Sequence, residues 1–282
     1  MATSIDNAFI KQFEREVHEA YQRFGSKLRP TVRTIANVNG SSAVFQKVGK
    51  GAASTKSAHG MVPVMNLAHT AIEVALQDYY AGDWVDRLDE MKINIDERQV
   101  IANAGGYALG RKTDELIIAA LAAVGAGQKI ADVNVGMTKD KILAAYEMLG
   151  AADVPDDGQR FGVVGWKQWS ELLKIPEFSS ADYAGPEDLP WKGAGQAKFW
   201  LGTYWFQHSG LPKDGSDIRS CFWYHRNAIG HAANSDVQTD ITWHGDRAAH
   251  FVNNMMSQGA VSYTHLRAHE TDSYLVCRLL LE

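Results

Sequence analysis

The chain has 282 residues, a formal net charge of −5 at pH 7 and 22% charged side chains. Tight binding to nucleic acid needs clustered positive charge, which this balance does not supply. Its two cysteines exclude a disulfide framework. No apolar run approaches the ~20 residues of a membrane span, so we expect a globular protein without a membrane partner.

Residues 1–30 predict an amphipathic N-terminal helix. Ser4 or Asp6 can cap its start, and Gly25 and Pro30 end it. Its apolar side chains recur every three to four residues, and they are Phe9, Phe13, Val17, Tyr21 and Phe24. The stripe is narrow, so we expect this helix to lie on the core of this chain or on a neighbour.

Residues 31–95 predict a long β-hairpin with connecting strands. Asn39-Gly40 is a hairpin turn signal, and residues 43–48 and 70–76 have strand character. No acidic residue occurs from Gly40 to Ile72, whereas this stretch holds Lys47, Lys50, Lys56, His59 and His69. The glycine spacing in residues 49–54 does not match a phosphate-binding loop. We therefore expect a projecting basic arm.

Residues 96–124 predict one long helix of roughly 42 Å. Asp96 and Gln99 have the spacing of a capping box, and Gly125 and Gly127 follow its end. Gly105 and Gly106 together cost about 2 kcal/mol relative to alanine, which is tolerable where another backbone comes close or the helix bends.

A charged group interrupts the apolar stripe of this helix. Arg111 can pair with Asp114 or Glu115 at helical spacing. Two interpretations stay open: a solvated ion pair at the helix edge, or a charge buried where two layers or subunits meet.

The remaining chain mixes helices and strands without a regular alternation, which favours an α+β fold over a doubly wound sheet. The aromatic-rich strand at 197–207 must have both faces covered. The predicted elements are helices at 138–150 and 166–174, strands at 161–164, 197–207, 219–224, 241–243 and 248–255, a loop at 178–195, and a small-residue segment at 227–233.

The last 22 residues, 261–282, differ in character. Val261–Thr271 and Leu275–Leu281 resemble the translated adapter of a transposase-prepared sequencing library. We expect this tail to be an artefact. On that interpretation Cys221 is the single natural cysteine and the natural protein continues beyond Ala260.

Four histidines form the one candidate metal cluster: His225, His231, His244 and His250. Their spacings of six, thirteen and six residues lack the helical pair of a zinc protease. A metal-dependent hydrolase using the His225–His250 region is kept as the alternative function. Cys221 with His225 is a weak nucleophile candidate, and a buried structural cysteine is the favoured interpretation.

Other chemistry has simpler explanations. Asp156 and Asp157 lie in a predicted turn, where solvated charge is expected. A row of aromatics resembles a sugar platform, although such stripes are more often core or interface; its members are Trp200, Tyr204, Trp205, Phe206, Phe222, Trp223 and Tyr224. We therefore predict no catalytic, cofactor-binding or metal-binding residues, no cofactor and no enzyme.

Taken in order, these segments resemble the major capsid (coat) proteins of tailed double-stranded-DNA bacteriophages. The strongest local likenesses are 108–118 (ALGRKTDELII), 199–212, 227–232 (NAIGHA) and Gly259-Ala260. The resemblance covers nearly all of residues 5–260.

The resemblance implies the tailed-phage major-capsid fold, an α+β fold. It assigns residues 1–30 to an N-terminal arm and 96–137 to a peripheral domain with a spine helix. Residues 31–95 would form an extended loop and connecting strands, with 31–72 reaching over an adjacent subunit. Residues 138–233 would form an axial domain around hexamer and pentamer centres. Residues 234–260 would return to the peripheral domain, truncated before the artefactual tail at 261–282.

The implied function is structural. Many copies would self-assemble into an icosahedral shell that encloses phage DNA without sequence-specific binding. The resemblance further implies assembly in the cytoplasm of a bacterial host, a place in the virion, and a portal. Because the chain lacks a long N-terminal scaffolding segment, a separate scaffold protein is also expected.

Overall fold

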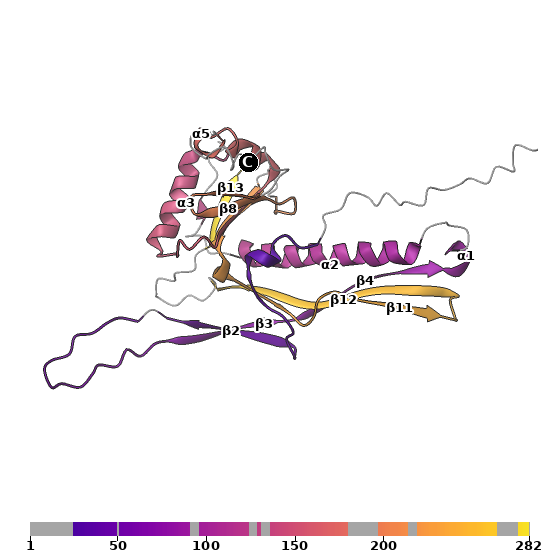
Figure 1. The fold of residues 1–282 in the computed structure, drawn as a ribbon, viewed down its shortest axis with the longest axis horizontal. Coiled ribbons are helices and arrows are strands. Elements are labelled where there is room, and N and C mark those ends of the chain that lie inside the picture. Colours follow the sequence, from indigo (N-terminus) through magenta and orange to yellow (C-terminus); the bar gives the residue numbers. More distant parts are fainter. Residues whose placement is uncertain are drawn as a thin grey trace, which may run out of the picture. The chain divides into compact units, whose positions relative to one another are not determined.

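The computed structural model describes residues 25–49, 51–90, 96–123, 129–130, 136–179, 197–213 and 219–263, together with the backbone of 276–281. These residues form two compact units. Unit 1 contains Asp78–Arg111 and Asp236–Met256, and unit 2 contains Ser26–Gln77, Lys112–Ser235 and the residues from Ser257 onward. Helices and mixed sheets occur together (Figure 1), which confirms the α+β prediction.

Unit 2 is built on a six-stranded mixed sheet. In pairing order its strands are β5 (Lys129–Ile130), β13 (Val276–Leu281), β9 (Arg219–His225), β6 (Arg160–Val164), β8 (Thr203–Gln207) and β7 (Lys198–Trp200). β6 runs parallel to β8 and antiparallel to β9. The predicted strands at 161–164 and 219–224 are confirmed.

Three helices cover one face of this sheet: α3 (Lys139–Ala151), α4 (Trp166–Leu172) and α5 (Pro176–Ser179). The Thr138 side chain caps α3 by accepting a hydrogen bond from Lys141 N, which confirms the predicted start of that helix. Ring contacts join helices to strands, with centroid distances of 6.2 Å between Tyr146 and Trp223 and 5.3 Å between Phe178 and Trp200. This packing forms the main hydrophobic core.

Gly162 has a packing role in the covered face. It pairs with both Trp205 and Trp223, so the three residues share one face of the sheet. A Cβ atom at Gly162 would lie 2.5 Å from the Trp205 ring. The missing side chain therefore makes room for the buried indole of Trp205.

A second part of unit 2 surrounds the predicted hairpin. β2 (Ser42–Val48) pairs antiparallel with β3 (His69–Ala75), as predicted. Asn39-Gly40 is not the turn of this hairpin: the two residues precede β2, and the connection between its strands is the long segment 49–68. Phe45 packs edge-on against Tyr263 in a small separate core.

The remaining strands of unit 2 form a short ladder. β1 (Arg33–Ile35) runs parallel to β10 (Ile229–Ala233), and β10 pairs antiparallel with the end of β12 (Ala249–Ser262). Two 3₁₀ turns, η1 (Arg29–Thr31) and η3 (Arg226–Ala228), flank these strands.

Unit 1 combines a three-stranded ladder with the first half of the long helix. β11 (Gln238–His244) and β4 (Gln77–Asp86) both pair with β12. A short helix, α1 (Arg87–Glu90), follows β4. Sequence reasoning missed β4, α1 and the strand character of β10, whereas it located β11 and β12 correctly but shortened both.

The long helix is confirmed as α2 (Glu97–Ala122). Asp96 Oδ1 accepts from Gln99 N at 3.4 Å, so the predicted N-cap forms, although the Gln99 side chain donates to Asn103 instead of returning to Asp96. A Cβ atom at Gly105 would lie 2.1 Å from Asn254 Nδ2 and 3.0 Å from the Ala81 carbonyl. The predicted close approach of another backbone is therefore confirmed at Gly105.

The two glycines of α2 should respond oppositely to alanine. Nothing lies within 4 Å of a Cβ at Gly106, so Gly106→Ala should stabilise the chain by up to about 1 kcal/mol through helix propensity. At Gly105 the same gain is opposed by displacement of Asn254, so Gly105→Ala should be neutral or destabilising by about 1–3 kcal/mol. Chemical denaturation of both variants measures the difference, and equal effects would show that β12 does not constrain α2 there.

The predicted single strand at 197–207 is wrong. It is a tight hairpin, because Leu201 and Gly202 adopt positive φ values of 50° and 66° between β7 and β8. Paired positive φ angles form the two-residue turn that matches the twist of a hairpin. Leucine at the first position concealed this turn.

Part of the predicted tail is described in the structure. Val261 and Ser262 continue β12 and pair with Gly230 and Ile229. The backbone of 276–281 pairs with β9. The artefactual origin of residues 261–282 stays a prediction. Most of the predicted helix in residues 1–30 and of the loop at 178–195 lies outside the described residues. Within the described part, Arg29–Thr31 form η1, and Phe178 and Ser179 belong to α5 rather than to a loop. In the part that is described, no helix is both long and apolar enough to cross a bilayer.

Candidate assembly surfaces

The structure does not bring the four histidines together. His225 and His231 belong to unit 2, and His244 and His250 to unit 1. His250 pairs with Trp243 across β11 and β12, whereas His244 is the next residue along β11 and so points to the opposite face. Within the described ranges, no three histidine, cysteine or acidic side chains are close enough to hold a metal ion.

Each of these histidines has a contact within its own unit. His225 Nε2 lies 3.1 Å from Asp157 Oδ1, and His231 Nε2 lies 3.2 Å from Gln258 Oε1. His244 contacts the Trp84 ring at a centroid distance of 5.0 Å, and His250 contacts Trp243 at 4.9 Å. These arrangements do not support the hydrolase alternative.

Cys221 is a structural cysteine, as predicted. Its side chain is fully buried, and burial raises the pKa of the thiol to about 12. His225 is four residues further along the same strand, a separation of roughly 13 Å. The thiol therefore has neither the thiolate character nor the neighbouring base that nucleophilic catalysis needs.

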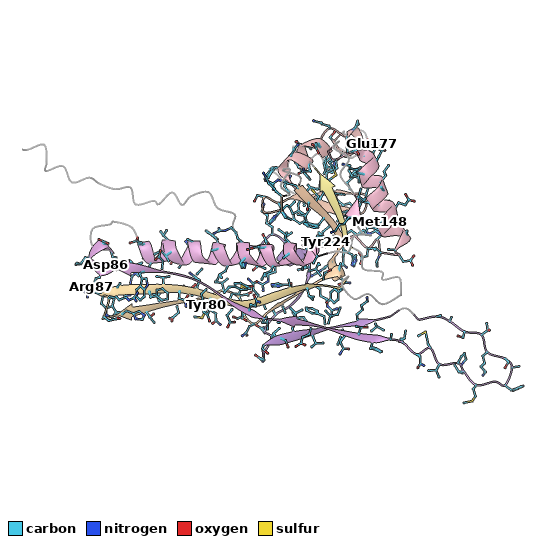
Figure 2. The ribbon with its side chains drawn as sticks, turned by 180° about the vertical axis from the view of Figure 1, so that it is seen from behind. Tyr80, Asp86, Arg87, Met148, Glu177 and Tyr224 are labelled. Atoms are coloured by element: carbon cyan, nitrogen blue, oxygen red, sulfur yellow. The ribbon has the colours of Figure 1, made fainter. Side chains whose placement is uncertain are left out.

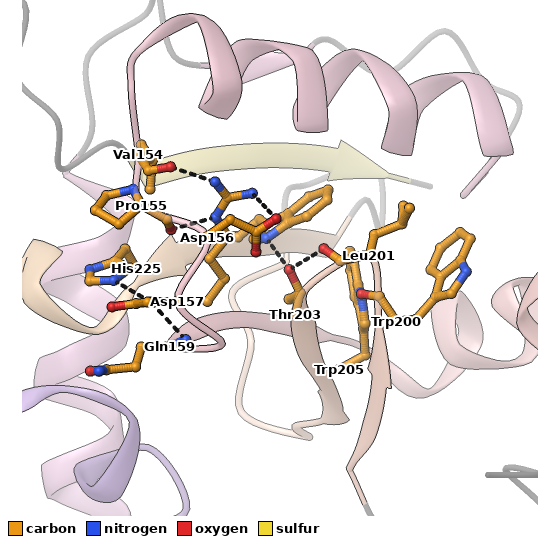
Figure 3. Close-up of polar contacts among 12 residues, drawn as sticks. Val154, Pro155, Asp156, Asp157, Gln159, Trp200, Leu201, Thr203, Trp205 and His225 are labelled. Atoms are coloured by element: carbon orange, nitrogen blue, oxygen red, sulfur yellow. Dashed lines mark hydrogen bonds and ion pairs between the residues drawn. The ribbon is translucent and has the colours of Figure 1, made fainter.

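The predicted turn with Asp156 and Asp157 is held in place by hydrogen bonds within the chain (Figure 3). Arg160 is 4% exposed and donates to the carbonyl oxygens of Pro155 at 2.9 Å and Val154 at 2.5 Å. Asp157 Oδ1 accepts from Gln159 N at 3.0 Å and contacts His225. These contacts fasten the turn to the ends of β6 and β9.

Asp114 is the most enclosed charged group in the described chain. Its side chain is 0% exposed and lies 2.9 Å from His208 Nε2. It also accepts from Ser26 Oγ at 2.5 Å and Leu28 N at 3.0 Å. Of the two interpretations of the charged group on α2, the buried one holds for Asp114, while Glu115 forms an exposed pair with Lys112.

The balance of these contacts favours the carboxylate form. Burial opposes ionisation of Asp114, but the hydrogen bonds from His208, Ser26 and Leu28 outweigh it and hold its pKa below the usual range. Gly210 N donates to His208 Nδ1, which leaves the proton of a neutral imidazole on Nε2, facing Asp114. Asp114 therefore joins α2, the segment before η1 and the end of β8.

The aromatic sheet of unit 2 has one covered face and one partly open face. On the covered face Trp205 and Trp223 are fully buried, and their ring centroids lie 4.8 Å apart. On the other face Phe199 is 49% and Tyr204 41% exposed. The prediction that both faces of this strand are covered is therefore wrong for the isolated chain.

The connection between β2 and β3 presents apolar side chains to solvent. Met61 is 95%, Val64 84% and Val62 75% exposed, and Met65 and Leu67 are also exposed. Basic residues flank them at Lys47, Lys56 and His69, and no acid occurs from Gly40 to Ile72. A contiguous exposed apolar segment of this kind marks an interaction surface.

Unit 1 offers a second exposed surface at β11. All of its residues except His244 are exposed, including Ile241 and Trp243. Two arginines contact aromatic rings of this unit: the Arg247 guanidinium lies 4.4 Å from the centre of the Trp84 ring, and that of Arg87 lies 5.8 Å from the centre of the Trp243 ring. Tyr80, Asp86 and Arg87 are labelled in this unit in Figure 2.

Sequence reasoning missed two features of these surfaces. The Asp114–His208 contact joins residues 94 positions apart, and no local pattern signals such a pair. The open aromatic face depends on which side of the sheet the helices cover, and the sequence of residues 197–207 carries no signal of that.

Comparison with known proteins gives the chain a family. The model of the phage capsid protein family matches residues 5–265. No curated protein matches the chain in sequence.

Solved structures share the fold at low sequence identity. The capsid structure of the cyanophage P-SCSP1u has a TM-score of 0.73 at 16% identity and covers 99% of this chain and 95% of that chain. The capsid of the native GTA particle gives 0.71 at 13% identity over 99% and 97%. The capsid of Ralstonia phage GP4 gives 0.68 at 14% identity over 100% and 97%. The chain belongs to the phage capsid protein family, and it is a structural protein of the virion shell.

Proposed function

We propose that many copies of this chain form hexamers and pentamers and close into an icosahedral shell around phage double-stranded DNA. The observation that carries the proposal is the exposed apolar tip of the β2–β3 arm. Met61 is 95% exposed, and an isolated globular protein gains nothing from presenting such side chains to water. A neighbouring copy would cover them.

The segments take the roles that the sequence suggested. Residues 1–30 serve as an N-terminal arm and 31–95 as the extended loop with its connecting strands. Residues 96–137 and 234–260 form the peripheral domain with α2 as its spine, and 138–233 form the axial domain near the hexamer and pentamer centres.

Charge complementarity supports docking of the arm on unit 1 of an adjacent copy. The arm is basic, whereas the exposed charges of β4, α1 and the β11–β12 hairpin are mainly acidic. The exposed acids of this surface are Asp78, Asp83, Asp86, Asp89, Asp236, Asp240 and Asp246. Such pairing steers association and weakens as salt rises.

Further partners follow from the closed shell. A separate scaffold protein would set its curvature and a portal would occupy one vertex, with assembly in the cytoplasm of the bacterial host. The net charge of −5 is compatible with a shell that encloses DNA without binding it tightly, since strong phosphate binding needs clustered cations.

Assembly of the purified chain, alone and with a scaffold protein, tests the proposal. Negative-stain electron microscopy and sedimentation should show capsomers or closed shells, with a yield that falls as salt rises from about 50 to 500 mM, because screening weakens the docking of the arm. A monodisperse monomer at high protein concentration under all these conditions would contradict it.

A further inference from the structure

The open side of the unit 2 sheet is an ordered aromatic row. Phe199 pairs with Tyr204 across β7 and β8, and Tyr204 pairs with Phe161 across β8 and β6. Their ring centroids are 4.9 and 6.1 Å apart. The row continues to Tyr224, where η1 covers it through the Thr31 Oγ1 contact of 2.6 Å with the Tyr224 hydroxyl.

Beyond η1 the aromatic row is exposed and borders a cavity. A cavity of about 440 Å³ lies against it, and its described lining includes Phe161, Tyr204 and Phe206. Lys27 supplies the charged side chain of that lining. We name Phe161, Phe199, Tyr204, Phe206 and Lys27 the open face.

The same unit carries a second uncovered patch, on α3. Leu143 is 43% and Tyr146 36% exposed. Asp140 and Glu147 lie three residues before and four residues after Leu143, so all four share one side of the helix. We name these four residues the α3 patch.

The charge of the α3 patch is acidic because the lysines of this helix are engaged elsewhere. Lys139 pairs with Glu177, and Lys141 is buried and donates to the Gly136 carbonyl. Asp140 and Glu147 are exposed. An apolar centre with acidic edges complements an aromatic face edged by a lysine.

We propose that the α3 patch of one copy packs on the open face of the next copy, with Glu147 beside the partner's Lys27. The inference rests on the proposed function and specifies one contact within the capsomer. A helix laid on an uncovered sheet face supplies the layer that the aromatic row lacks. Because the two surfaces differ, the contact is head-to-tail, the kind of contact that builds a ring when the rotation between copies closes. The basic β2–β3 arm fits the open face less well, since its lysines would meet Lys27.

Cysteine cross-linking tests the contact in assembled particles. The variant Leu143→Cys/Tyr204→Cys, in a Cys277→Ser background, is treated with a short bismaleimide; the buried Cys221 does not react. We expect a ladder of cross-linked species from dimer up to the ring. A link within one chain would run as a monomer. Each single variant and the control Ser170→Cys/Tyr204→Cys, which uses an exposed site on α4, should give no ladder.

Charge reversal gives an independent readout. Lys27→Glu should lower the yield of capsomers about tenfold, and adding Glu147→Lys should restore it. Lys174→Glu, at an exposed site outside both surfaces, is the matched control and should assemble normally.

The outcomes separate this inference from the function on which it rests. Particles that form without the ladder, or that form a ladder only with Met61→Cys/Tyr204→Cys, overturn the α3 contact and leave the shell intact. Failure of the unmodified chain to form any particle overturns both.

Discussion

Asp114→Ala is expected to lower the free energy of unfolding of the free chain by about 3–5 kcal/mol. The substitution removes the acceptor of the buried His208 Nε2 and Leu28 N and of the partly buried Ser26 Oγ. Each buried donor that loses its acceptor has still been removed from water, and no hydrogen bond now offsets the free-energy cost of that desolvation. Urea denaturation at neutral pH measures the loss.

Two variants make this prediction specific. Glu115→Ala, one residue away, removes only an exposed pair with Lys112 and should change stability by less than about 1 kcal/mol. His208→Ala combined with Asp114→Ala should cost less than the sum of the single variants, because both act on one contact. If Asp114→Ala lowers the free energy of unfolding no more than Glu115→Ala does, then Asp114 does not stabilise the segment before η1.

The contribution of Asp114 should also depend on pH. Its folded-state pKa lies below the ordinary value of an aspartate side chain, so the native state favours the carboxylate. This stabilisation is present above the unfolded pKa and is lost as the pH falls through the folded one. The stability difference between the parent and Asp114→Asn should therefore shrink as the pH falls below about 4. A stability difference that grows as the pH falls below about 4 would contradict the lowered pKa of Asp114.

Local signals determined the elements that the sequence predicted correctly. Asp96 and Thr138 cap α2 and α3 with their side chains, and capping depends on only a few neighbouring residues. The β2–β3 hairpin was recognisable because its alternating segments are bounded by small residues. The family was recognisable from the order of these elements together with short matching stretches.

The errors occurred where tertiary contacts outweigh local preference. Leu201 adopts a left-handed conformation that its residue type disfavours, so the β7–β8 turn was hidden. Three of the five residues of β10, Gly230, Ala232 and Ala233, have weak strand propensity, and the segment becomes a strand because β1 and β12 lie on its two sides.

The candidate surfaces also include one that the sequence predicted and others that it could not predict. The acid-free arm is a composition signal and was visible in the sequence. The α3 patch and the open face each depend on what else covers a helix or a sheet, which only the folded chain determines. The histidines from His225 to His250 were kept only for the alternative function, and the fold does not favour it, because alternation along β11 and β12 points His244 and His250 to opposite faces.

Replacing the apolar tip of the arm should abolish shell formation while the free chain keeps its stability. In Met61→Ser/Val64→Ser/Met65→Ser, three exposed side chains become polar. Each buried side chain of this size contributes about 1.5–3 kcal/mol, so each contact between copies should weaken by roughly 5–9 kcal/mol, more than about a thousandfold. Because every copy in a shell repeats the contact, assembly should fail even at high protein concentration. Electron microscopy and sedimentation measure this loss.

The thermal midpoint of the free variant separates assembly from folding. Side chains that are mostly in water contribute little to stability, so the midpoint should shift by no more than about 2 °C. The control Ser54→Ala/Thr55→Ala alters exposed residues of the same connection and should assemble like the parent. Normal shells from the triple variant would mean that the tip is not buried between copies. A lowered midpoint would instead mean that the tip packs on its own chain, and the arm would then stabilise the monomer rather than join neighbouring copies.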